Sequence, residues 1–103
     1  NSQSIKDRKN LSANGYIELT IIINQKGIVH KRPVITYRGL PIYETEDFIY
    51  GLEDQIQKIT KTFSLGNKKQ DHNLIDSLKI VCRKYSREKT GKKPFTNINL
   101  VRI

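Results

Sequence analysis

The sequence has 103 residues, and 19 Lys and Arg against 10 Asp and Glu give it a formal net charge of +9 at pH 7. This length fits one small domain that buries roughly 65% of the surface of the unfolded chain, and the charge suits polyanions, acidic lipids or acidic proteins as partners. The single cysteine, Cys82, excludes an internal disulfide and a cysteine-rich zinc framework, and no run approaches the ~18 apolar residues of a membrane span, so we expect a cytoplasmic protein without a membrane partner.

The first half of the chain predicts two strands. Residues 16–23, "YIELTIII", alternate with period two, which is typical of a half-buried strand. The polar "NQKG" offers Asn24 and Gly27 for a tight connection, and residues 28–37, "IVHKRPVITY", follow as a second strand. We expect an antiparallel hairpin, with Pro33 at a bulge or on an unpaired edge because proline has no N–H to donate.

Two amphipathic helices follow the predicted hairpin. Acidic residues around Thr45 favour a helix N-terminus, and the apolar positions then recur every three or four residues at Phe48, Leu52, Ile56, Ile59 and Phe63. After a break at Gly66, Asp71 is the expected N-cap of a second helix. Its apolar stripe runs through Leu74, Leu78, Val81 and Tyr85, flanked by Ile75 and Cys82.

The chain closes with a helix stop and one more strand. Residues 87–94, "REKTGKKP", place cations before Gly91 and a proline beyond it, as at the end of a helix. Residues 95–103, "FTNINLVRI", alternate polar and apolar side chains. The order ββααβ predicts an α+β domain of two layers, a small three-stranded mixed sheet covered on one face by two helices. The other face of the sheet then meets water or a partner.

The residue types that support catalysis are sparse in this sequence. His30 and His72 stand far apart and form no His-x-His or His-x-x-x-His pair, so neither is expected to bind a metal. Cys82 has no His neighbour and is expected to be an inert core thiol. No phosphate-binding glycine motif and no acid–base pair of carboxylates stands out.

Basic residues give the sequence its most informative pattern. They gather in the break between the helices and around the end of the second helix. The candidates for contact with RNA phosphates or with another domain are Arg87, Lys89, Lys92, Lys93, Lys68 and Lys69. A solvated surface is the alternative for each of them. Tyr37, Tyr43 and Tyr50 could stack on bases, but aromatic residues at such positions pack more often in a core or an interface.

Three stretches in order resemble the C-terminal domain of ribonuclease J. They are "DRKNLSANGYIELTIII", "RPVITYRGLPIYETED" and "YSREKTGKKPFTNINLVRI", and together the likeness extends over residues 7–103. The residues that carry it are Asp7, Arg8, Gly15, Pro33, Arg38, Gly39, Glu88, Lys89, Thr90 and Pro94. Tyr37 and Leu40 stand in place of the family's Ser and Phe, and Lys92-Lys93 in place of its Arg pair. A lysine pair does not reproduce the bidentate contacts that arginine makes.

The resemblance implies a parent ribonuclease with a metallo-β-lactamase and β-CASP core. That enzyme degrades RNA from the 5′ end and also cuts internally, with two divalent metal ions, zinc or manganese, held upstream. Residues 1–12 would then end a linker from the upstream catalytic region, and residues 13–103 would form the ribonuclease J-like C-terminal domain.

In this interpretation the domain is non-catalytic and binds no cofactor of its own. It supports activity and subunit assembly in a homo-oligomer, a dimer or tetramer, and its partners are RNA and the upstream domains. A stand-alone basic RNA-binding module and a protein-interaction domain unrelated to RNA are the alternatives.

Overall fold

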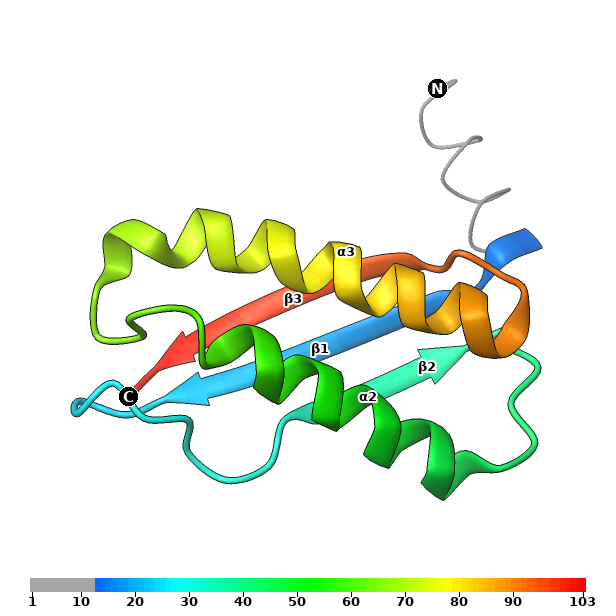
Figure 1. The fold of residues 1–103 in the computed structure, drawn as a ribbon, viewed down its shortest axis with the longest axis horizontal. Coiled ribbons are helices and arrows are strands. Elements are labelled where there is room, and N and C mark those ends of the chain that lie inside the picture. Colours follow the sequence, from blue (N-terminus) through cyan, green and yellow to red (C-terminus); the bar gives the residue numbers. More distant parts are fainter. Residues whose placement is uncertain (1–12) are drawn as a thin grey trace.

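The computed structural model describes residues 13–103, which fold into a sheet with two helices on one of its faces (Figure 1). The elements in chain order are β1 (Tyr16–Ile23), β2 (Val34–Arg38), α2 (Thr45–Thr60), the short 3₁₀ helix η1 (Lys68–Gln70), α3 (Asp71–Thr90) and β3 (Phe95–Arg102). The structure confirms the predicted order ββααβ and the α+β class. The predicted linker at residues 1–12 lies outside the described residues.

The sheet is mixed, with the strand order β2-β1-β3. β1 pairs with β2 in the antiparallel sense, so that Ile17 lies opposite Tyr37. β1 pairs with β3 in the parallel sense along its whole length, from Tyr16 opposite Phe95 onward. A parallel pair needs a long crossover connection, and here that connection contains both helices. β2 and β3 therefore form the two edges of the sheet.

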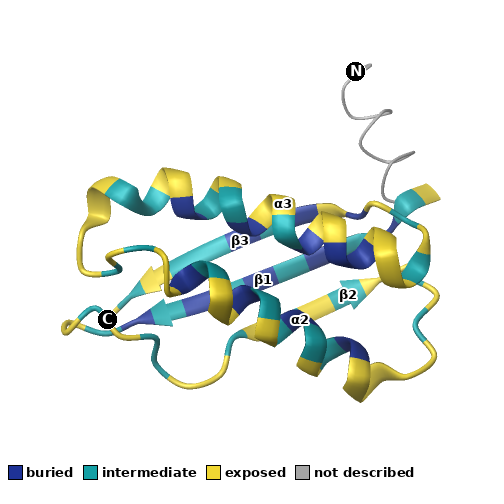
Figure 2. Cartoon of the chain, viewed as in Figure 1, coloured by how far each residue is buried: buried dark blue, intermediate teal, exposed yellow. Residues whose placement is uncertain are grey.

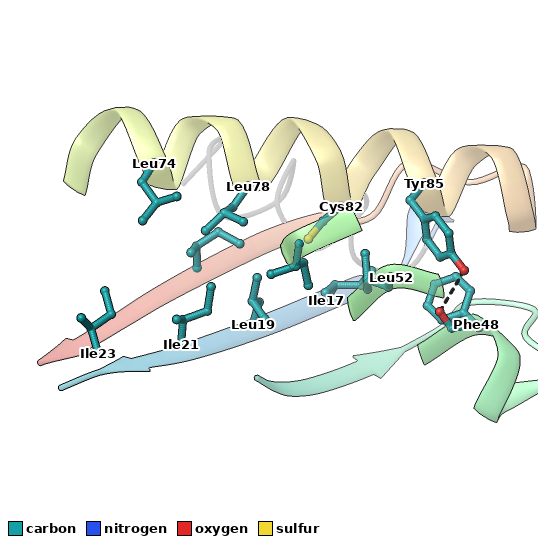
Figure 3. Packing of buried hydrophobic residues seen from close by; sticks show 12 residues of the cluster. Ile17, Leu19, Ile21, Ile23, Phe48, Leu52, Leu74, Leu78, Cys82 and Tyr85 are labelled. Atoms are coloured by element: carbon teal, nitrogen blue, oxygen red, sulfur yellow. Dashed lines mark hydrogen bonds between the residues drawn. The ribbon is translucent and has the colours of Figure 1, made fainter. Parts of the chain in front are cut away.

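The hydrophobic core lies between the sheet and the helices. Alternation along β1 points one row of its side chains toward the helices, and all of that row is fully buried: Ile17, Leu19, Ile21 and Ile23. Figure 3 shows this row beneath Leu74, Leu78 and Cys82 of α3, with Leu52 of α2 beside it, and Figure 2 shows the same burial along β1. Each fully buried aliphatic side chain contributes about 1.5–3 kcal/mol to stability.

The second strand is shorter than residues 28–37. Its first half contacts β1 only locally, through an isolated bridge between Val29 and Ile23 and a hydrogen bond from the His30 N–H to the Ile22 carbonyl at 2.7 Å, and the regular ladder begins at Val34. Two features prevent an earlier start. Lys31 adopts a left-handed backbone conformation with φ of 62°, and Pro33 has no N–H for the ladder. Pro33 therefore lies directly outside the strand instead of interrupting it.

The predicted turn after β1 is confirmed. The Asn24 side chain accepts hydrogen bonds from the backbone N–H groups of Lys26 and Ile28, at 2.9 and 3.0 Å. Gly27 has a φ of 74°, which glycine adopts without strain. The predicted helix stop is also confirmed. Gly91 has a φ of 79°, and its N–H donates to the Arg87 carbonyl at 2.8 Å.

The predicted N-cap of the second helix is wrong. Gln70 occupies the N-cap position, and Asp71 is the first helical residue. Two features explain the shift. η1 precedes the helix, with Asn67 accepting a hydrogen bond from the Lys69 backbone N–H at 3.0 Å, and the Asp71 carboxylate is engaged by Arg102 instead of by the backbone of its own helix.

Candidate functional site

Gly15 directly precedes β1 and packs closely against the backbone at the end of β2. It has a φ of 81°, and a Cβ at this position would meet the carbonyl oxygens of Arg38 and Gly39 at 2.8 and 2.9 Å. Any other residue would force these two segments apart. Gly15 and Gly39 both have a positive φ, so these two glycines serve the backbone of the fold. Arg38 is the last residue of β2 and is exposed. Asp7 and Arg8, which the resemblance also singles out, lie outside the described residues.

The sequence "EKTGKKP" fixes the passage from α3 into β3. The Thr90 hydroxyl donates to the Ser86 carbonyl at 2.7 Å and accepts from the Lys92 backbone N–H at 3.2 Å. Pro94 is fully buried at the start of the strand. Glu88 lies exposed in the last turn of the helix. These positions shape a turn, and their side chains do not converge on a reaction centre.

The six predicted cationic candidates do not form one patch. Lys68 and Lys69 lie in η1, before the first residue of α3, whereas Arg87 and Lys89 lie in its last turn. A helix of 20 residues is about 30 Å long, so the two groups stand at opposite ends of it. The basic pairs that look equivalent in the sequence therefore belong to separate surfaces.

The cations after the helix also diverge. The Lys89 ammonium lies 5.8 Å from the centroid of the Tyr85 ring, and Lys89 lines a hollow of about 250 Å³ between the start of α2 and the end of α3. Lys93 lines a different hollow, of about 490 Å³, together with Lys79 and Arg83 of α3. Lys79 was missed as a candidate, although its spacing of four from Arg83 places both on one side of a helix.

A third hollow, of about 680 Å³, lies between α2 and the segment that leads into β2. Arg32 occupies its rim, where its guanidinium donates to the Glu53 carboxylate at 2.7 Å and lies 5.3 Å from the centroid of the Tyr50 ring. The hydrogen bonds to Glu53 raise the pKa of Arg32 above its ordinary value. Charges of both signs line this hollow, so it favours no particular class of ligand.

The second face of the sheet is open, because among residues 13–103 both helices lie on the opposite face (Figure 1). The strand register arranges its side chains in rows across the sheet. From one end to the other the rows are Arg38–Tyr16–Phe95, Thr36–Glu18–Asn97, Val34–Thr20–Asn99 and Ile22–Val101. We call these residues the open face. Its ends are aromatic and aliphatic, and its middle is polar.

Hydrogen bonds connect the polar middle of the open face. The Tyr16 hydroxyl donates to Glu18 at 2.6 Å, and this bond raises the pKa of Tyr16 above its ordinary value. Asn99 donates to Thr20 at 3.2 Å and to Glu18 at 3.4 Å. The Tyr16 ring stacks on that of Phe95 with centroids 6.1 Å apart. A mixed surface of this kind, with aromatic residues beside bonded polar groups, is typical of protein interfaces.

The family model of the ribonuclease J C-terminal domain matches residues 3–103. The chain belongs to this family. No curated protein matches the sequence. The family match confirms the resemblance carried by the three sequence stretches, and it makes this chain a relative of ribonuclease J.

The described part of this ribonuclease J C-terminal domain offers no metal centre. In residues 13–103 no three His, Cys, Asp or Glu side chains come together as a possible metal site. Burial raises the pKa of the Cys82 thiol to about 12, so this sulfur stays protonated and unreactive at neutral pH.

In the described residues neither helix has the length and apolar character needed to cross a membrane.

Proposed function

We propose that this chain is the non-catalytic C-terminal domain of a ribonuclease J-related RNA-degrading enzyme, and that it supports subunit assembly. The family match over residues 3–103 connects the chain with ribonuclease J. The parent enzyme would cleave RNA from its 5′ end and internally, with the metal ions held in its metallo-β-lactamase and β-CASP domains. RNA and those upstream domains are then the partners of this domain.

The non-catalytic role is part of this proposal, and the described residues are compatible with it. They bring no set of metal ligands together, and their one thiol is fully buried. His72 sits on the exposed side of α3, 3.3 Å from Asp76, in a pair that spans one helical turn. Such a surface pair needs no functional explanation. No step of RNA cleavage is therefore assigned to this domain.

The open face is the observation that carries the assembly role. Val34, Phe95 and Val101 on this face are 53%, 46% and 41% exposed. A second copy of the chain that packed its open face against this one would cover them, and a two-fold axis would make the contact self-complementary. The bonded polar groups of Glu18 and Asn99 would not be left without partners in such an interface.

The size of the open face limits how tightly it can associate. Three strands of about 4.8 Å spacing and 3.3 Å rise per residue give a face well below the ~800 Å² that each partner contributes to a standard interface. We therefore expect association of the isolated chain to depend on concentration. Contacts from the rest of the parent enzyme would strengthen it.

Light scattering of the 103-residue chain over a range of concentrations tests this proposal. We expect the mean mass to rise with concentration, and Val101→Glu to abolish the rise because it places a charge in the interface. Ile80→Glu is the matched control, since Ile80 is 66% exposed on the helical layer, away from the open face. A chain that stays monomeric throughout contradicts the proposal, as does an equal effect of the two substitutions.

A further inference from the structure

A hollow beside β3 brings together three cations from two separated segments. Lys79 and Arg83 come from successive turns of α3, and Lys93 comes from the connection to β3. The hollow measures about 490 Å³, and the rest of its lining is Asn14, Pro94, Phe95 and Thr96. No carboxylate lines it. Among residues 13–103 the ion pairs involve none of these three cations, which leaves their charges available to an external anion.

The three cations are held by rigid elements. Lys79 and Arg83 are exposed on the flank of a long helix, each next to a core residue, Leu78 or Cys82, that packs on the sheet. Lys93 is fixed between the left-handed Gly91 that ends the helix and the fully buried Pro94. Sites on such elements keep their geometry better than sites on loops. Lys92, the neighbour of Lys93 in the sequence, does not line the hollow.

An exposed aromatic ring belongs to the same hollow. Phe95 is 46% exposed, and its ring stacks on that of Tyr16 at the open face. The cations of the hollow therefore lie on the helical side of the edge strand β3, and the Phe95 ring lies on the other side of that strand, toward the open face. A flexible chain would have to cross the edge of the sheet at β3 to contact both the cations and the ring.

Cations next to an exposed ring match the chemistry of a polynucleotide strand. Lysine and arginine bind phosphates, and arginine does so with two parallel hydrogen bonds. Aromatic rings bind bases by stacking, which requires that the base is not paired in a duplex. An acidic protein segment would use the same cations but has no base to place on Phe95.

We propose that Lys79, Arg83, Lys93 and Phe95 form a binding site for single-stranded nucleic acid. The three cations contact successive phosphates, and Phe95 carries a base. Lys93 is one of the six cationic candidates from the sequence, whereas Lys79 and Phe95 are not among them. The three cations lie on the helical side of the sheet, away from the open face. Phe95 belongs to both surfaces, so a base on its ring and a second copy on the open face would compete for it.

Binding of a short fluorescein-labelled RNA without internal pairing, followed by anisotropy, tests the cations. We expect the double substitution Lys79→Gln and Arg83→Gln to weaken binding by about tenfold or more. It should also lower the log–log dependence of affinity on salt by about 1.4, since each phosphate contact to a single strand contributes about 0.7. Lys68→Gln with Lys69→Gln removes the same charge at the far end of α3 and should retain most of the affinity.

The two adjacent lysines provide a second matched pair. Lys93→Gln should weaken binding, whereas Lys92→Gln should not, although both remove one charge from the same connection. Equal losses in this pair, or in the two double variants, would mean that the RNA responds only to net charge. Either result overturns the proposed site.

Phe95→Leu tests the base contact and keeps apolar bulk over Tyr16. We expect it to weaken binding of the single strand by about fivefold or more, and to leave binding of a duplex of the same sequence unchanged. A thermal melt by circular dichroism shows that the variant is folded. An equal effect on single strand and duplex contradicts the proposal. Displacement of the RNA by polyglutamate at matched charge would contradict it too, and would assign the hollow to an acidic protein.

Discussion

The Arg102 guanidinium donates two hydrogen bonds to the Asp71 carboxylate, from Nη2 at 2.6 Å and from Nε at 3.1 Å. This bidentate pair connects the last residue of β3 with the first residue of α3, 31 positions apart in the sequence. The hydrogen bonds raise the pKa of Arg102 above its ordinary value. The side chains of Arg102 and Asp71 are only 19% and 29% exposed, so solvent screens this ion pair less than one on the surface.

Loss of this pair should destabilise the fold. Asp71→Asn should lower the free energy of unfolding in urea by about 1–2 kcal/mol, because it removes a charge-assisted bidentate contact and an acidic residue from the first turn of a helix. Asp76→Asn makes the same chemical change at an exposed position of α3 and should cost less than about 0.5 kcal/mol. Similar costs for both variants would show that the contact with Arg102 contributes nothing.

Gly51 should be required in the middle of α2. An alanine normally stabilises a helix by about 1 kcal/mol relative to glycine, but a Cβ on Gly51 would overlap the Tyr85 hydroxyl oxygen. That hydroxyl donates to the Phe48 carbonyl at 3.0 Å, so it is not free to move away. Gly51→Ala should therefore lower the melting temperature. Combination with Tyr85→Phe should recover part of the loss, and strictly additive effects would argue against the clash.

Ser86→Ala should be neutral or stabilising. The Ser86 side chain is fully buried in α3, and its hydroxyl has no hydrogen-bond partner among residues 13–103. A buried hydroxyl without a partner costs about 1–3 kcal/mol, and alanine also has the higher helix propensity. Chemical denaturation of the two proteins measures the difference. A marked loss of stability in the variant would show that the hydroxyl is satisfied in solution.

The buried thiol should make stability fall at high pH. Burial raises the pKa of Cys82 to about 12 from an ordinary value of 9.0, so below pH 9 the thiol is neutral in both the folded and the unfolded chain. Between about pH 9 and 12 only the unfolded chain ionises, which lowers the free energy of unfolding by up to about 1.4 kcal/mol per pH unit. Cys82→Ala should lose this part of the slope, whereas an unchanged slope would assign it to other groups.

The sequence was sufficient to predict the elements of the fold but not all of their bounds. A strand or helix that buries one face repeats its apolar residues with the period of that element. The structure confirms the alternating burial of residues 16–23 and the burial of Leu74 and Leu78. The start of β2 depends on the backbone of Lys31, whose positive φ has no clear sequence signal. The role of Asp71 depends on Arg102, which only the folded chain brings near it.

The candidate site was harder to predict for the same reason. The sequence shows that residues 87–93 are basic. It does not show that Lys89 lines one hollow and Lys93 lines another. The approach of Lys79 to Lys93 arises from the packing of α3 beside β3. The open face, in contrast, was predicted from the polar alternation of β1.

Methyl NMR spectra recorded over increasing protein concentration test the assembly role most directly. We expect chemical-shift changes for the open-face methyl groups of Ile22, Val34 and Val101, and none for the exposed Ile28 and Ile80, which lie elsewhere. Changes confined to Ile28 or Ile80, or spectra that do not depend on concentration, would contradict it.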